Sequence, residues 1–78
     1  MRYTYLDLIE EVLVENGKPM TISHIWEYAN EKGLSKKLSS IGKTPKKTMN
    51  AMLHKDMLRG DNAKFKQISN KPALFDLI

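Results

Sequence analysis

Gly42-Lys43-Thr44-Pro45-Lys46-Lys47 opens the stretch of sequence that decides the fold, and Thr48-Met49-Asn50-Ala51-Met52-Leu53-His54-Lys55-Asp56 completes it. Thr44 is of a type that caps helices, and Pro45 suits the first helical position because its φ is already helical and it has no amide to leave unpaired. At 100° per residue, one side of this helix consists of Met49, Met52, Leu53 and Met57, and the other of Lys47, Asn50, Ala51, His54 and Lys55. A helix with an apolar side and a basic outward side is typical of nucleic-acid recognition.

The charge is unevenly distributed along the chain. Residues 1–33 carry three Lys/Arg and six Asp/Glu, a net charge of −3, whereas residues 34–78 carry ten Lys/Arg and three Asp/Glu, a net charge of +7. This asymmetry indicates that the second half contacts a polyanion while the first half acts as a scaffold. The alternative is that the lysines only keep a small domain soluble.

Length and composition exclude several classes of protein. The 78 residues predict a single domain over 1–78 with a thin core, because a chain of this size buries only about 60–65% of its unfolded surface. The absence of cysteine excludes disulfides, thiolate zinc sites and a cysteine nucleophile. The longest apolar runs, such as Val12-Leu13-Val14, are far shorter than the ~20 residues that span a bilayer, and no signal peptide is present. We therefore expect a cytoplasmic module without a membrane partner.

Two helices are expected in the first half. The first spans 5–16, with Thr4 as its cap and Gly17 just past its end. Its buried stripe is predicted to be Leu6, Ile9, Val12 and Leu13, with Glu10, Glu11 and Glu15 facing water. The second spans 22–32 and ends at Gly33. Its apolar stripe is Ile25, Trp26 and Ala29, and Trp26 is expected to be the core anchor.

The segments between the helices are short. Met20-Thr21, just before the second helix, is an extended piece that could add a strand to a small sheet. The connector over 34–43 is expected to contain an irregular helical turn. Three of its apolar side chains could fill gaps beneath it: Leu34, Leu38 and Ile41.

A third helix and a hairpin complete the predicted fold. The helix spans 45–59 and is stopped by Gly60-Asp61-Asn62, and β-prone runs follow over 64–69 and 73–78, joined by Asn70-Lys71-Pro72. Phe65 and Ile68 fall on opposite faces of an ideal strand, so a bulge is expected between them. The result is a mainly α, α+β winged helix-turn-helix: three helices, a small β-hairpin wing and a possible third short strand.

The side chains that carry catalysis are scattered. His24 and His54 lie thirty residues apart on different predicted helices, and no carboxylate cluster has metal-ligand spacing. The four glycines are widely separated and form no phosphate-binding loop. We therefore expect no enzymatic activity, no cofactor, no metal and no small-molecule substrate.

Binding to DNA has better support. Lys46 and Lys47 stand at a helix start, where backbone amides already favour phosphate, although a solvated lysine pair is the alternative. Asn50 can contact adenine and His54 can donate to a base or phosphate, although either could equally be an ordinary surface residue. The hairpin lysines would form a wing that touches the DNA backbone or minor groove. The predicted DNA-binding residues are Lys43, Thr44, Lys46, Lys47, Asn50, His54, Lys55, Lys64, Lys66 and Lys71.

An ordered set of short motifs resembles the HARE-HTH family. The motifs cover essentially the entire chain: Thr4-Tyr5-Leu6-Asp7, Gly17-Lys18-Pro19-Met20, Ile25-Trp26, Gly42-Lys43-Thr44-Pro45, Leu53 with Asp56, and Lys71-Pro72-Ala73-Leu74-Phe75. The segment Lys36-Lys37-Leu38-Ser39-Ser40-Ile41 is most similar to the N-terminal modules of bacterial restriction-endonuclease-like proteins. Other members occur in the delta subunit of bacterial RNA polymerase and in eukaryotic chromatin proteins. The resemblance implies a winged helix that engages DNA, often in the recognition of modified or restricted sequences.

Two departures from the family pattern bear on function. A delta subunit is expected to continue into a long acidic tail, which this chain lacks as given, so we expect 1–78 to be an N-terminal module of a larger protein. Relatives often carry an acidic or neutral residue after Thr-Pro, whereas Lys46 and Lys47 stand here, which favours direct DNA contact.

The sequence thus predicts a module that binds double-stranded DNA. Helix 45–59 would lie in the major groove and hairpin 63–78 would serve as the wing, bringing a fused or partner nuclease domain of a restriction-type system to DNA. The alternative is a protein-interaction module that docks an acidic partner such as RNA polymerase, because winged helices also serve that purpose.

Overall fold

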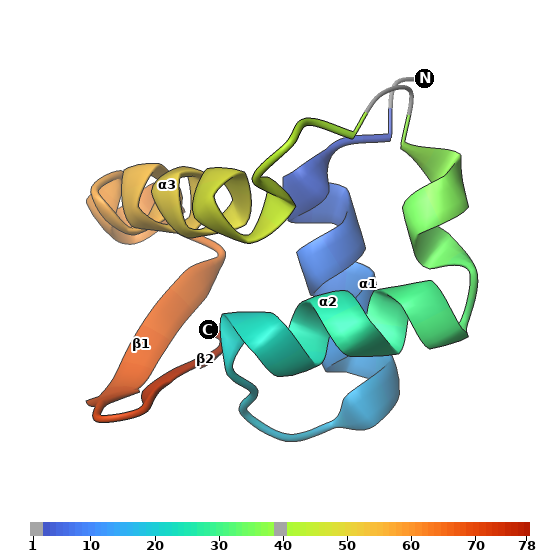
Figure 1. The fold of residues 1–78 in the computed structure, drawn as a ribbon. Coiled ribbons are helices and arrows are strands. Elements are labelled where there is room, and N and C mark those ends of the chain that lie inside the picture. The colour runs from blue at the N-terminus through green and yellow to red at the C-terminus, as the bar shows by residue number, and fades with distance from the viewer. Residues whose placement is uncertain (1–2, 39–40) are drawn as a thin grey trace.

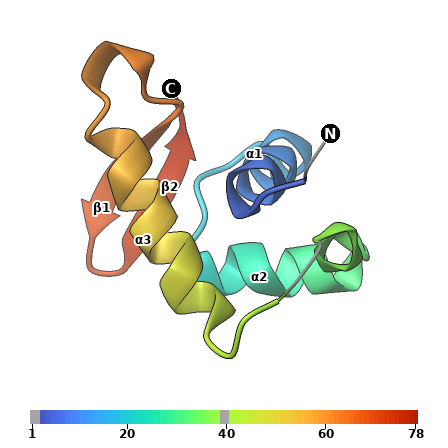
Figure 2. The ribbon, with the colours of Figure 1, turned by 90° about the horizontal axis from the view of Figure 1, so that it is seen from above.

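A computed structural model describes residues 3–38 and 41–78 of the chain. Its elements, in order, are α1 (Tyr5–Asn16), α2 (Ile22–Glu31), the 3₁₀ turn η1 (Leu34–Lys37), α3 (Pro45–Met57), the 3₁₀ turn η2 (Gly60–Asn62), β1 (Phe65–Asn70) and β2 (Ala73–Leu77). Three helices followed by an antiparallel hairpin confirm the predicted winged-helix fold (Figure 1). Seen from above, the hairpin lies beside α3 and away from η1 (Figure 2).

Helix α1 has the predicted bounds and a closed start. The Thr4 hydroxyl accepts from the Asp7 amide at 3.2 Å, and the Asp7 carboxylate accepts from the Thr4 amide at 2.9 Å. The hydrogen bonds from the Thr4 amide and then its hydroxyl hold the pKa of Asp7 below its usual range. At the other end, Gly17 adopts the left-handed conformation with φ 74° and donates to the Leu13 carbonyl, which ends the helix.

The buried stripe of α1 differs in part from the prediction. Leu8 is fully buried and joins Ile9, Val12 and Leu13, whereas Leu6 is only half-buried. The reason is that α1 packs against α2, α3 and β2, so its buried face is wider than a single stripe. Glu11 does not simply face water, because it accepts from the Tyr3 hydroxyl at 2.8 Å. Burial, followed by this hydrogen bond, raises the pKa of Tyr3.

Helix α2 ends one residue before the predicted position and is anchored by a different side chain. Ile25 and Ala29 are fully buried, whereas Trp26 is half-buried and lies against Tyr5 with ring centroids 6.4 Å apart. The prediction of Trp26 as the core anchor was therefore wrong; the indole lies at the border of the core. A large ring at this border covers apolar surface without being enclosed on all sides.

The connector contains the expected helical turn as η1. Leu34 is buried and Leu38 packs against the core, as predicted, but Ile41 is 50% exposed and fills no gap. Ser39 and Ser40, which belong to the motif quoted for the family resemblance, lie outside the described residues.

Helix α3 begins at Pro45 as predicted but ends at Met57 rather than at residue 59, because the chain tightens there into η2. Met49 and Leu53 are fully buried, while Met52 and Met57 are half-buried. Asp56 lies on the same side and is also buried, which the apolar pattern did not predict.

The hairpin contains the predicted bulge, between Gln67 and Ser69, and it leaves Ile68 without a partner in β2. The third strand is reduced to one residue: Met20 pairs with Phe75 of β2 through backbone hydrogen bonds of 3.0 and 2.9 Å. Thr21 is not part of the sheet because its hydroxyl caps α2 by accepting from the His24 amide. Phe65 and Phe75 insert between the hairpin and the helices and bring the wing into the common core.

Candidate nucleic-acid interface

The outward side of α3 is exposed as the sequence predicts. Each predicted contact residue in α3 and just before it is exposed to solvent: Lys43, Thr44, Lys46, Lys47, Asn50, His54 and Lys55. His54 also packs edge-on toward Phe75 of β2, with ring centroids 6.3 Å apart. This contact places His54 on the part of α3 nearest the hairpin.

The start of α3 differs from the predicted capped start. Thr44 occupies the cap position with ψ 68°, and its side chain makes no capping hydrogen bond. Its carbonyl instead accepts from the amide and the hydroxyl of Thr48, at 3.1 and 3.2 Å. The amides of Lys46 and Lys47 are therefore left without the side-chain cap that α1 and α2 have, and both carry exposed ammonium groups. An anionic group is favoured at such a start.

Three cations of the second half are paired, and two of them reach α1. Lys64 lies 3.9 Å from Glu10, and Lys37 lies 3.4 Å from Glu11. The third, Arg59, lies 3.6 Å from Asp56. The structure therefore turns Lys64 toward α1 and does not group it with the other predicted contact residues.

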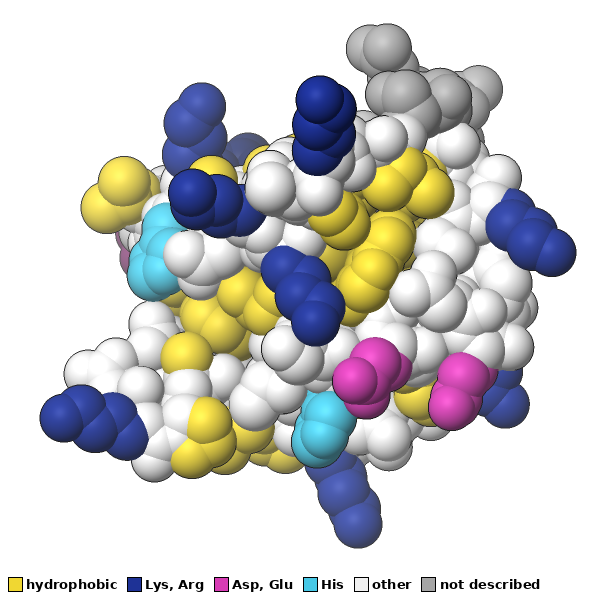
Figure 3. All heavy atoms as spheres, viewed as in Figure 1, with side chains coloured by type: hydrophobic (Ala, Val, Ile, Leu, Met, Phe, Trp, Pro, Cys, Tyr) yellow, Lys and Arg dark blue, Asp and Glu magenta, His cyan; other side chains and the backbone are white. Residues whose placement is uncertain are grey.

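Six further lysines have no acidic partner within residues 3–38 and 41–78, and they lie on and before α3 and on the hairpin: Lys43, Lys46, Lys47, Lys55, Lys66 and Lys71. In the space-filling view, Lys and Arg side chains stand over α3 and at the hairpin turn, while acidic side chains lie along α2 (Figure 3). Lys18, Lys32 and Lys36 are also exposed without an acidic partner among the described residues, but they lie before α2 and around its end.

Asp56 connects α3 to the wing. Its Oδ2 accepts from the backbone amides of Lys64 and Phe65, at 2.8 and 3.1 Å, and its side chain is fully buried. A buried carboxylate that accepts two backbone amides fixes the chain where the hairpin begins. We did not include Asp56 among the site residues predicted from sequence. The available signal was an acidic residue among the apolar positions of the predicted helix.

The outer edge of β1 is also fixed by side chains. Asp56 occupies the amide of Phe65, and the Gln67 amide group donates to the Ser69 carbonyl at 3.0 Å and to Asn70 Oδ1 at 2.6 Å. Edge groups that are hydrogen-bonded within the hairpin are less available to pair with another strand. The wing is therefore better suited to present its exposed side chains, among them Lys66 and Lys71, than its backbone.

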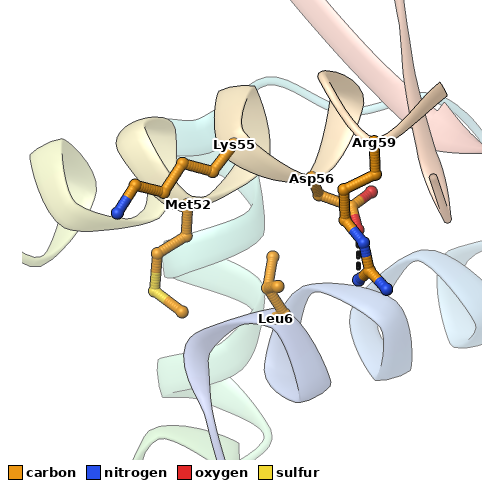
Figure 4. Close-up of a pocket in the computed structure, with 5 residues that line it drawn as sticks. All are labelled: Leu6, Met52, Lys55, Asp56 and Arg59. Carbon is orange, nitrogen blue, oxygen red and sulfur yellow. Dashed lines mark ion pairs between the residues drawn. The ribbon is translucent and has the colours of Figure 1, made fainter. Parts of the chain in front are cut away.

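A shallow pocket of about 140 Å³ lies between α1 and the second half of α3. Its lining residues are Leu6, Met52, Lys55, Asp56 and Arg59 (Figure 4). Arg59 folds toward Asp56, whereas the Lys55 ammonium extends away from the carboxylate (Figure 4). Lys55 therefore borders the side of α3 that faces α1 rather than the middle of its outward side.

The described residues contain no cluster of three or more His, Asp or Glu side chains placed to hold a metal ion. None of the helices described is both long and apolar enough to cross a membrane.

Comparison with protein families decides the assignment. The model of the HARE-HTH family, whose description names the helix-turn-helix domain of ASXL and restriction endonucleases, matches residues 3–77. The chain belongs to the HARE-HTH family. This membership confirms the resemblance drawn from the motifs, and a helix-turn-helix family supports DNA binding by a domain of a generally non-catalytic type. No match was found among curated proteins or solved structures.

Proposed function

We propose that this HARE-HTH domain binds double-stranded DNA with α3 in the major groove and the hairpin along the backbone, and that it brings a DNA-acting protein of the restriction type to its target. The observation that carries this proposal is the distribution of cations. Lysines without an acidic partner among the described residues follow α3 and the hairpin, whereas Lys64 and Lys37 are paired with carboxylates of α1.

The contacts divide into two kinds. Lys43, Lys46 and Lys47 lie at the start of α3 and would bind phosphates, and Lys66 and Lys71 would do the same from the wing. Asn50 and His54 lie one turn further along α3, where they would approach base edges. Phosphate contacts would supply most of the affinity, and a single domain is expected to bind in the range of roughly 10⁻⁴–10⁻⁶ M at physiological salt.

An NMR titration of the isotope-labelled chain with a short mixed-sequence duplex, at low and at moderate salt, tests this proposal. Salt-sensitive shifts are expected in residues 43–55 and 64–71. If about four phosphates are neutralised, the logarithm of the binding constant should fall with the logarithm of salt with a slope near −3.6. Lys18 and Lys36 serve as internal controls, because they are exposed lysines outside the proposed interface.

Two results would contradict the proposal. A slope indistinguishable from zero would exclude phosphate contact, and shifts centred on Lys18 and Lys36 would place the interface elsewhere. The absence of any shift at low salt would favour the second candidate, a module that docks an acidic protein such as RNA polymerase.

A further inference from the structure

The outward side of α3 has an apolar crest. The buried side of the helix consists of Met49, Leu53 and Asp56. On a helical wheel of 100° per residue, Ala51 and Leu58 point within about 20° of the opposite direction. Leu58 directly follows the last residue of α3 in helical conformation, and it is 85% exposed. We call Ala51 and Leu58 the apolar crest.

Cationic and polar side chains flank this crest. Lys47 and His54 lie on the same outward stripe as the crest, one turn from Ala51 in either direction, and both are exposed. A Leu side chain with most of its surface in water is unfavourable unless a partner covers it, because burial of each CH₂ group contributes about 0.8 kcal/mol. The flanking Lys47, which has no acidic partner among the described residues, favours a polyanion as that partner.

The apolar group that DNA presents in its major groove is the C5-methyl of thymine, which Ala and other apolar side chains contact. We propose that the apolar crest recognises thymine methyl groups, so that the domain prefers A·T pairs beneath the second half of α3. Asn50 lies next to Ala51 and is suited to the adenine of such a pair, through its N6 and N7 atoms. This inference rests on the proposed function and specifies the DNA that the same interface prefers.

The test compares two duplexes that differ only in the methyl group. One is a short alternating A·T duplex, which presents thymine methyls in every register, and the other carries deoxyuridine in place of thymine. Binding of the full chain is measured by fluorescence anisotropy at several salt concentrations. We expect the thymine duplex to bind about fourfold more tightly for each methyl group contacted.

Variants identify the residues responsible. Leu58→Gln and Ala51→Ser should each lower the ratio of thymine to uracil affinity toward one while leaving the affinity for the uracil duplex nearly unchanged. Both positions are exposed, so neither change opens a cavity in the core. Val14→Gln is the matched control, because Val14 is 64% exposed on α1, and it should leave the ratio unchanged.

The outcomes separate this inference from the proposed function. Salt-dependent binding with equal affinity for the two duplexes would overturn methyl recognition and leave DNA binding in place. A thymine preference that survives both crest variants would overturn the assignment to Ala51 and Leu58. Absence of salt-dependent binding to either duplex would overturn the proposed function and this inference with it.

Discussion

The starts of α1 and α3 look alike in sequence and differ in structure. Both helices have threonine at the cap position, Thr4 and Thr44. At α1 the hydroxyl accepts from the third helical amide, and the Asp7 carboxylate returns a hydrogen bond to the cap residue. At α3 no side-chain cap forms, and lysine occupies the position that corresponds to Asp7. The start of α1 is closed by its own side chains, whereas the start of α3 is open.

The residue at the third helical position explains the difference in part. Asp7 can accept a hydrogen bond from the cap residue, whereas Lys47 can only donate. The backbone also differs, because ψ is 170° at Thr4 and 68° at Thr44. At α2, Thr21 with ψ 161° caps the helix although its third residue is histidine. A helix start that is open and lysine-rich is suited to an external anion, while the two closed starts belong to the scaffold.

The two ends of α3 repeat this contrast, because its start is open and its end is fastened to the wing by Asp56. We expect Asp56→Ala to lower the free energy of unfolding by about 3 kcal/mol, since two buried backbone amides lose their acceptor. Urea unfolding followed by circular dichroism measures this loss. Asp61→Ala is the control, because Asp61 is exposed in η2 and should change stability by less than about 0.5 kcal/mol. Equal losses in the two variants would show that Asp56 does not fasten the wing.

Reversing the charge at the open start tests its proposed use. Lys46→Glu combined with Lys47→Glu should lower DNA affinity by at least about tenfold and make the salt slope shallower by about 1.8, because two phosphate contacts are lost. Glutamate in the first turn favours the helix, so weaker binding would not reflect unfolding. Lys18→Glu with Lys36→Glu changes the net charge by the same amount outside the interface. Equal loss in both double variants would mean that only net charge matters.

Removing each threonine hydroxyl tests the comparison directly. Thr4→Ala should destabilise the protein by about 1 kcal/mol, the usual effect of losing a side-chain cap. Thr44→Ala should have almost no effect on stability, since its hydroxyl makes no capping hydrogen bond. Thermal unfolding of the two variants side by side provides the measurement. If Thr44→Ala were as destabilising as Thr4→Ala, then α3 would be capped in solution.

Much of this fold could be predicted because local signals dominate a small chain. Thr4, Asp7 and Gly17 define α1 through interactions within a few residues, and the mismatch of Phe65 and Ile68 predicted the bulge. What could not be predicted depends on contacts between distant residues. The burial of Leu8 follows from three elements packing around α1, and the single pairing of Met20 follows from the position of β2.

The candidate site shows the same limit. A helical wheel correctly placed Lys47 and His54 on the exposed side of α3, because periodicity alone determines the faces of a helix. It could not show that Lys64 turns toward Glu10, or that Asp56 accepts amides from the start of the hairpin, since both depend on how the wing docks. DNA contact by the individual side chains stays a prediction.

The smallest expected effect concerns the pH dependence of the closed start. The pKa of Asp7 is lowered in the folded protein by the Thr4 amide and hydroxyl, so its ionised form stabilises the fold. This contribution is fully present above the ordinary Asp pKa of about 3.9 and is lost as pH falls through the lower value of the folded state. Asp7→Asn should therefore be less stable than the parent at pH 6, by less than the loss in Thr4→Ala because Asp7 is exposed. The difference between Asp7→Asn and the parent should shrink as pH falls below about 4, which unfolding midpoints in urea across this range would reveal. A difference that stays constant with pH would mean that the charge of Asp7 does not contribute, and that the cap depends on hydrogen-bond geometry alone.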